Sequence, residues 1–188
     1  MNIDSAVLYF FYAVAGIHWS LDWLIVFFAK YSPYAMLLVA AWVILGEKGR
    51  KRQLQLFFVA ALSALLSRAI ITECISFFYS RSRPFAALQL EPLFSSESAH
   101  SFPSGHASFY AAVALAIYLY NRRAGAWLIS LTLIMGLARI AAGIHWPSDI
   151  FAGFIVGVAS VFAVHWFLGD ESAAQRDSKT EASAGIES

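Results

Sequence analysis

The sequence predicts an all-α fold, an integral-membrane bundle of about five to six helices. Hydrophobic residues make up 60% of the 188 residues and charged residues only 13%, whereas roughly 25% of a soluble domain is charged. Apolar runs of about 20 residues, the length that crosses the hydrocarbon core as a helix, recur along the chain. One soluble core of this size could not bury so much apolar surface, so lipid must cover part of it.

Five apolar runs reach or approach the length of a membrane span. The first is interrupted by Lys30 and Pro33, which should bend or split its helix. A shorter apolar and aromatic stretch at 3–17 fits an interfacial or tilted helix. We expect one membrane-embedded domain at 1–168, with spans at 21–45, 54–79, 107–120 and its flanks, 126–144 and 150–168.

The tail, the cysteine content and the charge of the chain narrow the class of protein. The polar, acidic stretch at 169–188 predicts a disordered cytoplasmic tail. No Lys or Arg precedes Lys30, so the basic start of a cleavable signal peptide is not expected. Cys74 is the only cysteine, which rules out an internal disulfide, and we expect it to be a small buried hydrophobe. A net charge of +1 without a basic stripe gives no reason to expect a nucleic-acid partner.

The basic residues predict the orientation. Six of the 13 lie in two short connections, which the positive-inside rule assigns to the cytoplasm. Alternation of the spans then brings the segment 81–103 and the turn around His145 to the opposite, non-cytoplasmic face. The six residues are Lys48, Arg50, Lys51, Arg52, Arg122 and Arg123.

One of the polar clusters on that face opens the third span. Ser104 and Gly105 precede an apolar run, so they should lie at a helix N-terminus. An ordinary cap is one interpretation. The other is an anion site, because Gly lets the backbone approach a ligand and N-terminal amides bind phosphate. His106 would then be placed to donate a proton to a leaving oxygen.

A second cluster joins the fourth and fifth spans. His145 and Asp149 flank Pro147, which is favourable at the first position of a helix. Asp149 either complements the helix dipole or accepts a hydrogen bond from His145, which would fix the tautomer and free the other ring nitrogen to attack. Arg139 lies near the outer end of a span and should face the protein interior. Arg83, closing the second span, is equally compatible with snorkelling to lipid headgroups.

Phosphoryl transfer suits this set of residues. Its transition state spreads negative charge over oxygens that arginines and backbone amides stabilise. The sequence has no H-E-x-x-H pattern and no P-loop, so we expect arginines in place of metal ions and no cofactor. A lipid-binding scaffold or a transporter is the non-enzymatic alternative, for which Arg68 and Glu73 inside the second span are the candidate features.

These residues resemble the type 2 phosphatidic acid phosphatase family, whose superfamily includes vanadium haloperoxidases. Its motifs read K-x6-R-P, P-S-G-H and S-R-x5-H-x3-D. The second is complete at Pro103–His106, and the third is present with Ala138 in place of Ser. In the first, Ser76 stands where the family has Lys, and Arg81 is our candidate replacement.

The resemblance implies roles for individual residues. His145 would be the nucleophile that forms a phosphohistidine, Asp149 would orient it, and His106 would protonate the leaving group. The phosphate would be held by Arg83, Arg139, Ser104, the Gly105 amide and, on our hypothesis, Arg81.

Within the family, the short chain is most similar to bacterial undecaprenyl-diphosphatases of the bacitracin-resistance type, although some of these have Asp at the position of Gly105. The expected partners are a lipid phosphate or diphosphate and membrane lipids. The expected location is the bacterial inner membrane, with the site on its outer face. Phosphatidate, phosphatidylglycerophosphate and a lipid A phosphate remain alternative substrates.

Overall fold

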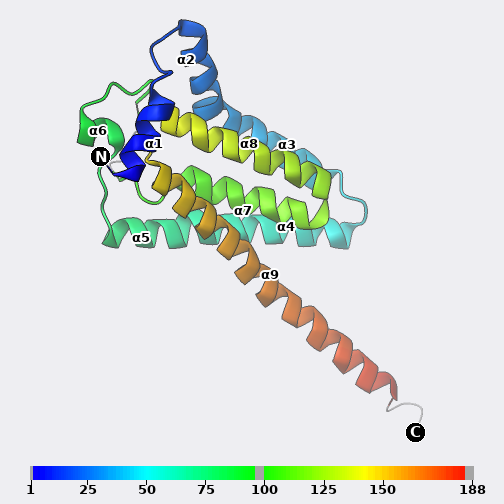
Figure 1. Ribbon diagram of the computed structural model, residues 1–188. Coiled ribbons are helices and arrows are strands. Elements are labelled where there is room, and N and C mark those ends of the chain that lie inside the picture. The colour runs from blue at the N-terminus through cyan, green and yellow to red at the C-terminus, as the bar shows by residue number, and fades with distance from the viewer. Residues whose placement is uncertain (1, 96–99, 185–188) are drawn as a thin grey trace.

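A computed structural model describes residues 2–95 and 100–184, with side chains up to residue 168 (Figure 1). All regular elements in these ranges are helices, which confirms the all-α prediction. Residues 96–99 of the predicted outer loop and 185–188 of the predicted tail lie outside the described residues. The elements are α1 (Ile3–Tyr12), α2 (Trp19–Val26), η1 (Phe27–Tyr31), α3 (Ser32–Leu45), α4 (Arg50–Leu65), η2 (Leu66–Thr72), α5 (Glu73–Phe78), α6 (Pro84–Leu88), α7 (Gly105–Tyr120), α8 (Arg122–Ala141) and α9 (Pro147–Ala184).

Four helices of the described residues are long and apolar enough to cross a membrane: Trp19–Leu45, Arg50–Phe78, Arg122–Ala141 and Pro147–Leu168. They match four of the five expected spans. The remaining expected span, at 107–120, corresponds to α7, which is apolar but shorter, with 16 residues. Large apolar side chains are exposed around the bundle, among them Trp42, Phe77, Phe151 and Trp166. Such a surface requires lipid contact.

Two of these spans contain a π-helical segment. In the first, η1 joins α2 to α3, and Pro33 falls in the opening turn of α3. The predicted interruption is therefore a change of direction within one continuous span (Figure 1). In the second span, η2 joins α4 to α5. π-helical turns are rare and occur often at functional sites.

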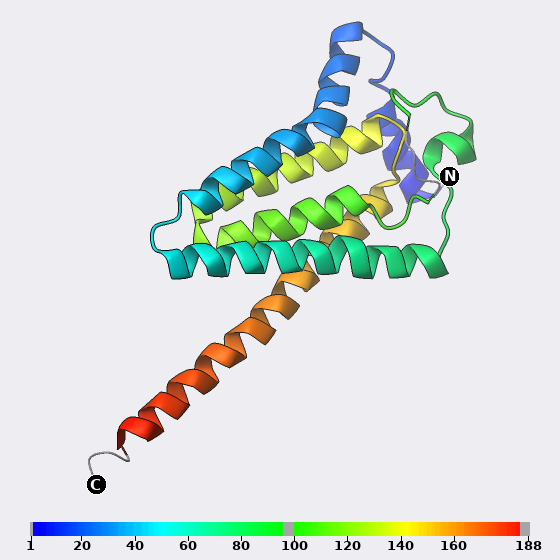
Figure 2. The same ribbon diagram turned by 180° about the vertical axis from the view of Figure 1, so that it is seen from behind.

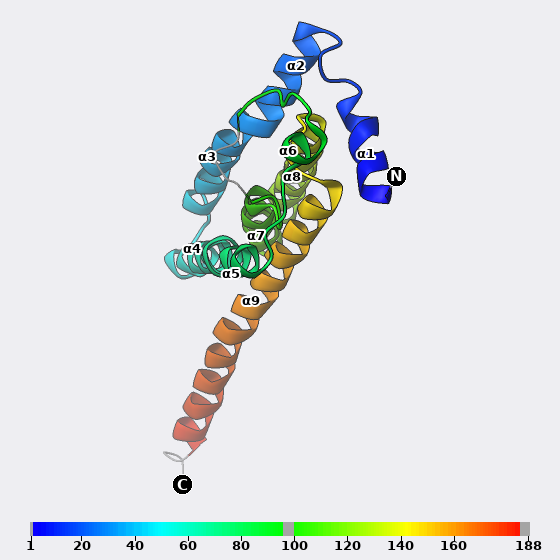
Figure 3. The same cartoon turned by 90° about the vertical axis from the view of Figure 1, so that its left-hand side faces the viewer.

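Helix α7 lies at the centre of the bundle, between α3, α4, α8 and α9 (Figure 3). Its backbone is approached closely by α9, because Gly153 and Gly157 have no side chain. A Cβ at Gly153 would lie 2.6 Å from the carbonyl oxygen of Ser104, and one at Gly157 would lie 2.5 Å from that of Ser108. Small residues of this kind let membrane helices pack backbone to backbone.

The short length of α7 leaves room above its first turn. At 1.5 Å per residue, α7 is about 24 Å long, less than the roughly 30 Å of a hydrocarbon core. Both side views show that α7 begins well short of the end of α5 (Figures 1 and 2). The N-terminus of α7 is therefore recessed within the bundle.

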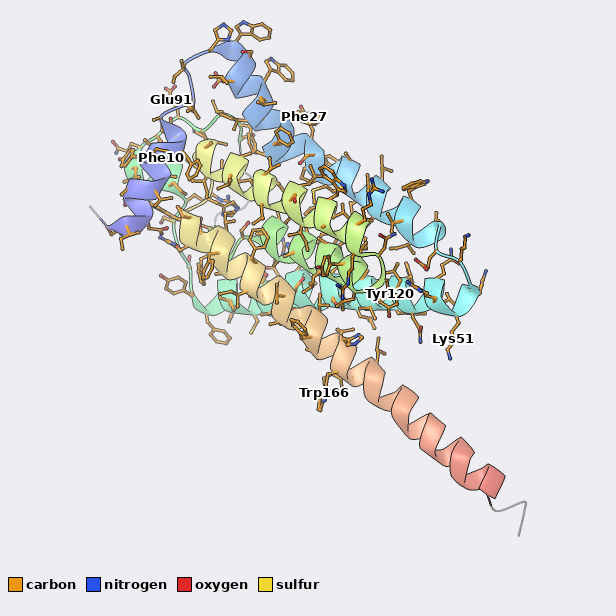
Figure 4. All side chains as sticks on the ribbon, turned by 45° about the vertical axis from the view of Figure 1, so that its right-hand side comes forward. Phe10, Phe27, Lys51, Glu91, Tyr120 and Trp166 are labelled. Atoms are coloured by element: carbon orange, nitrogen blue, oxygen red, sulfur yellow. The ribbon has the colours of Figure 1, made fainter. Side chains whose placement is uncertain are left out.

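The two basic connections lie at the same end of the bundle, as predicted. Arg52 Nη2 donates to the carbonyl oxygen of Tyr120 at 2.7 Å, which joins the start of α4 to the end of α7. Lys51 and Tyr120 occupy this end, and Phe10, Phe27 and Glu91 the other (Figure 4).

One expectation differs from the structure, since Cys74 is exposed on α5 rather than buried. Helix α9 extends to Ala184, and the disordered cytoplasmic tail at 169–188 stays a prediction. No proline occurs between Gly169 and Ala184, and the Ala, Glu, Gln and Lys residues there have high helix propensity.

Candidate active site

The predicted polar clusters meet in one cavity of about 420 Å³ at the end of the bundle opposite the basic connections. Its wall comes from the two π-helical segments, α3, α5, the outer loop, the start of α7, the end of α8 and the α8–α9 turn. The lining residues are Lys30, Tyr34, Arg68, Thr72, Glu73, Ser76, Arg83, Phe94, Ser95, His100, Pro103, Gly105, His106, Arg139 and His145.

His145 lies in the turn between α8 and α9 and is buried. Its Nδ1 is 3.4 Å from Asp149 Oδ2, and its Nε2 is 3.4 Å from Arg83 Nη1. A carboxylate only accepts hydrogen bonds, so Nδ1 carries the proton and Nε2 keeps its lone pair. The predicted contact with Asp149 is therefore present, and the basic nitrogen points away from it.

Asp149 is completely buried in the first turn of α9, which begins at Pro147 as predicted. Arg81 Nη1 donates to Oδ1 at 2.8 Å, and the amide of Trp146 donates to Oδ2 at 2.8 Å. The hydroxyl of Ser101 also donates to Oδ2. These donors compensate for burial of a negative charge and hold the carboxylate against the His145 ring.

Arg81 does not line the cavity, contrary to our hypothesis that it replaces the missing lysine. Its guanidinium pairs with Asp149 and with Asp4 of α1, and lies 4.9 Å from the centroid of the Trp146 ring. Asp4 in turn accepts from the amide of Ser148 at 2.9 Å. Burial alone would raise the pKa of Asp4, but hydrogen bonds from Ser148 and Arg81 hold it below its usual value. Arg81 therefore connects α1 to the carboxylate behind the cavity.

Arg83 and Arg139 line the cavity as predicted, and both are buried. Arg83 Nη1 donates to the carbonyl oxygen of Ile144 at 2.8 Å, which ties it to the turn that carries His145. Arg139 Nη1 donates to the carbonyl oxygen of Ala29 at 2.9 Å, while its Nε has no partner among the described residues. A buried guanidinium with an unsatisfied donor is suited to an anionic ligand.

The start of α7 has the predicted form. Ser104 is the N-cap, and its hydroxyl accepts from the amide of Ala107. It is buried outside the cavity lining, which favours the interpretation as an ordinary cap. Gly105 and His106 do line the cavity, and the ring of His106 stacks on Tyr110 at a centroid distance of 6.4 Å.

The cavity wall also contains residues that were not among the predicted site residues, and Ser76, His100, Lys30 and Arg68 are four of them. Ser76 donates to the carbonyl oxygen of Phe102 at 3.0 Å, so it fixes the loop before α7. The Nδ1 of His100 lies 2.8 Å from the hydroxyl of Ser80. Lys30 and Arg68 bring two further cations. The only sequence signal of Lys30 and Arg68 is a charge inside an apolar run, a feature that often marks function.

The pKa of His145 is expected to stay far below its ordinary value. Burial lowers it from 6.5 to about 4, and Arg139 and Arg83 add to the effect, which the hydrogen bond to Asp149 only partly offsets. The native state therefore binds fewer protons than the unfolded chain between these values. The contribution of His145 to stability should be fully present above pH 6.5 and should be lost as pH drops from about 6.5 to 4.

NMR titration in micelles, with His145→Gln for assignment, should find a neutral His145 ring at pH 5. A titration midpoint near 6.5 would contradict this prediction.

The model of the PAP2 superfamily matches residues 55–173. The chain is 32% identical over 144 residues to the bacitracin transport permease protein BcrC of Bacillus licheniformis, covering 74% of this chain and 68% of the relative. It is 30% identical over 140 residues to the undecaprenyl-diphosphatase BcrC of Bacillus subtilis, covering 73% and 70%.

Solved structures share the fold. Aquifex aeolicus LpxE aligns with a TM-score of 0.65 and 22% identity, over 87% of this chain and 95% of that one. A PAP2-type phosphatidylglycerolphosphate phosphatase from Bacillus subtilis aligns with a TM-score of 0.58 and 21% identity, over 89% and 85%. With the family match over more than half of the chain, these findings establish that the protein belongs to the PAP2 superfamily.

Proposed function

We propose that the protein is an undecaprenyl-diphosphatase, which hydrolyses undecaprenyl diphosphate to undecaprenyl phosphate and phosphate. The observation that carries the proposal is the meeting of His145, His106, Arg83 and Arg139 in one cavity. Two relatives that are at least 30% identical and match over more than two thirds of their length are named BcrC, and one of them is named as an undecaprenyl-diphosphatase.

The reaction has two steps in this proposal. In the first, the lone pair of His145 Nε2 attacks the terminal phosphorus and the bond to the bridging oxygen breaks, so that undecaprenyl phosphate leaves. In the second, water attacks the phosphohistidine, the N–P bond breaks and its electron pair returns to Nε2. His106 protonates the leaving oxygen in the first step and accepts the proton of water in the second.

The surrounding donors stabilise the transferred group. Arg83 and the unpaired Nε of Arg139 neutralise the charge that builds on the phosphoryl oxygens. The amides of Gly105 and His106 open α7 and form the positive end of its dipole, which attracts an anion. Asp149 keeps the proton on Nδ1 and stabilises the imidazole as it gains positive charge.

A lipid monophosphate is the second candidate substrate. A lipid A 1-phosphatase of Rhizobium johnstonii is 30% identical over 107 residues, which cover 54% of this chain and 42% of that protein. The test is phosphate release by the purified protein from undecaprenyl diphosphate, phosphatidate and phosphatidylglycerophosphate, with chelator present. We expect preference for the diphosphate and no loss with chelator. Absence of release from all three would favour the scaffold or transporter alternative.

His106→Ala separates the two substrate classes. Lipid phosphate is a good leaving group because its pKa is about 6, whereas the alcohol released from a phosphate monoester needs a proton donor. With a diphosphate, the variant should still form the phosphohistidine and fail at its hydrolysis, so labelled phosphate accumulates on the protein. With a monophosphate, neither step should proceed. Rapid-quench labelling measures both, and equal labelling from the two substrates would contradict these roles.

We also propose that the cavity faces the outside of the bacterial inner membrane, as the six basic residues at the opposite end support. Single cysteines at Glu91 and Lys51, in a Cys74→Ser background, report on the two ends (Figure 4). A membrane-impermeant thiol reagent should label Glu91→Cys in spheroplasts and Lys51→Cys only after lysis. The reverse pattern would place the site in the cytoplasm.

A further inference from the structure

Two cations of the cavity take no part in the contacts around His145. Lys30 belongs to η1 and Arg68 to η2, so each of the two π-helical segments in the described residues contributes one cavity cation. We call Lys30 and Arg68 the lateral pair. A charge inside a membrane span is costly unless it faces a polar cavity, and both side chains do so.

Arg68 lies directly against the N-terminus of α7. A Cβ at Gly105 would be 2.5 Å from Arg68 Nε and 2.8 Å from its Cδ. The glycine therefore makes the space that the guanidinium occupies. A cation placed beside the positive end of a helix is unfavourable by itself, so the arrangement favours a ligand with two anionic groups, one at the amides of α7 and one at the Arg68 guanidinium.

The lateral pair is only partly neutralised by the protein. Arg68 Nη1 pairs with Glu73, and no other hydrogen bond of this guanidinium occurs among the described residues. Lys30 Nζ lies 5.9 Å from the centroid of the Phe94 ring and has no carboxylate partner within the described ranges. Among the described residues, the cavity lining holds the cationic side chains of Lys30, Arg68, Arg83 and Arg139, and Glu73 is its carboxylate. The described part of the lining is therefore positively charged, which suits a ligand with more than one anionic group.

An apolar groove adjoins the polar cavity near Arg68. The groove, of about 520 Å³, runs between α3 and α4 over α7, and its lining includes Leu37, Leu65 and Phe109. Each of these lies three residues, nearly one helical turn, from a residue of the cavity wall: Tyr34, Arg68 and His106 respectively. The polar cavity therefore continues into an apolar one of a size that accepts a lipid chain.

We propose that the lateral pair binds the lipid-proximal phosphate of a lipid diphosphate, while Arg83 and Arg139 hold the terminal phosphate beside His145. Arg83 contacts His145, whereas Arg68 lies nearly one turn from Leu65 of the apolar groove, as the terminal phosphate and the lipid-proximal end of such a molecule would require. This inference rests on the proposed function. It also explains why Ser76 is tolerated in place of the motif lysine, since Arg68 lies about two turns earlier on the same span.

The test compares two substrates with the same short chain, farnesyl diphosphate and farnesyl phosphate. Arg68→Gln and Lys30→Gln should each lower kcat/KM for the diphosphate by about 10- to 100-fold, the effect of removing one charge-assisted hydrogen bond. The loss for the monophosphate should be at least about tenfold smaller. Arg68→Lys, which keeps the charge, should recover part of the diphosphate activity.

Arg52→Gln is the matched control. It also removes a cation from an arginine–glutamate pair, with a side-chain exposure of 54% against 45% for Arg68, but at the far end of the bundle. It should change neither the ratio of the two substrates nor the inhibition below. Thermal unfolding of each variant checks the fold.

A binding measurement makes the test independent of turnover. Inorganic pyrophosphate should inhibit the wild type more strongly than inorganic phosphate, and both lateral-pair variants should reduce this difference by about tenfold or more. Equal losses for the two substrates, or an unchanged preference for pyrophosphate, would overturn the inference and leave the phosphatase proposal intact. If the wild type hydrolysed neither substrate, the proposed function would be refuted instead.

Discussion

His145→Ala is expected to abolish phosphate release, with kcat lower by on the order of 10⁴-fold or more. The ring is buried beside the cavity, with Nδ1 against Asp149 and Nε2 toward Arg83. No other imidazole has this pair of contacts in the described part of the chain. On the proposed mechanism the variant loses the attacking nitrogen and keeps Arg83 and Arg139 as phosphate ligands. We expect inhibition by inorganic phosphate to survive when kcat is lost.

The covalent step gives this prediction a direct readout. A brief incubation of the wild type with labelled substrate should leave phosphate on the protein that is stable in alkali and released by acid, as expected for phosphohistidine. His145→Ala should show none. His165→Ala is the control, because His165 is exposed on α9 and outside the cavity lining, and it should behave as the wild type. Labelled phosphate on His145→Ala would assign the nucleophile to another residue.

The features predicted correctly from the sequence are those set by local patterns. Hydropathy identifies the spans because a lipid-facing helix needs an uninterrupted apolar run. The contact between His145 and Asp149 follows from four residues of separation around a proline that begins a helix. The start of α7 at Gly105 with Ser104 as its N-cap was also predicted, because a Ser before an apolar run is a local signal for a helix N-terminus.

The features missed depend on contacts between distant segments. Asp4 and Arg81 are 77 residues apart, and no pattern in either segment indicates that they pair. The π-helical segments have no sequence signature of their own, so Lys30 was interpreted as an interruption of a span and Arg68 as a feature of the scaffold or transporter alternative, and neither was predicted to line the cavity. Arg81 and Arg83 were both predicted to hold the phosphate, although only Arg83 lines the cavity.

Asp149→Asn should be the most damaging change that keeps the shape of a side chain. Asp149 is fully buried and accepts hydrogen bonds from Arg81, Ser101 and the Trp146 amide besides its contact with His145. An amide cannot accept from all of these donors, and it removes the charge that Arg81 faces. Breaking a buried pair of this kind costs about 3–5 kcal/mol, so the unfolding temperature in detergent should fall clearly.

The same substitution should affect catalysis beyond its effect on stability. Without the carboxylate, the His145 ring is free to place its proton on the wrong nitrogen, and the positive charge that develops during attack is no longer stabilised. We expect kcat to fall about 10³- to 10⁴-fold with little change in KM, because the proposed phosphate ligands Arg83 and Arg139 are untouched. Phosphohistidine formation, measured in a single turnover, should slow by the same factor.

Arg81→Gln is the comparison that separates orientation of His145 from stability. It removes the same ion pair from its other side and leaves the His145–Asp149 contact in place. Both variants should lose stability, but Arg81→Gln should retain kcat within about tenfold of the wild type, since its effect on the ring is indirect. If the two variants lost kcat equally at temperatures where both are folded, Asp149 would act through the fold alone. A loss confined to Asp149→Asn would establish the carboxylate as the group that sets the reactive tautomer of His145.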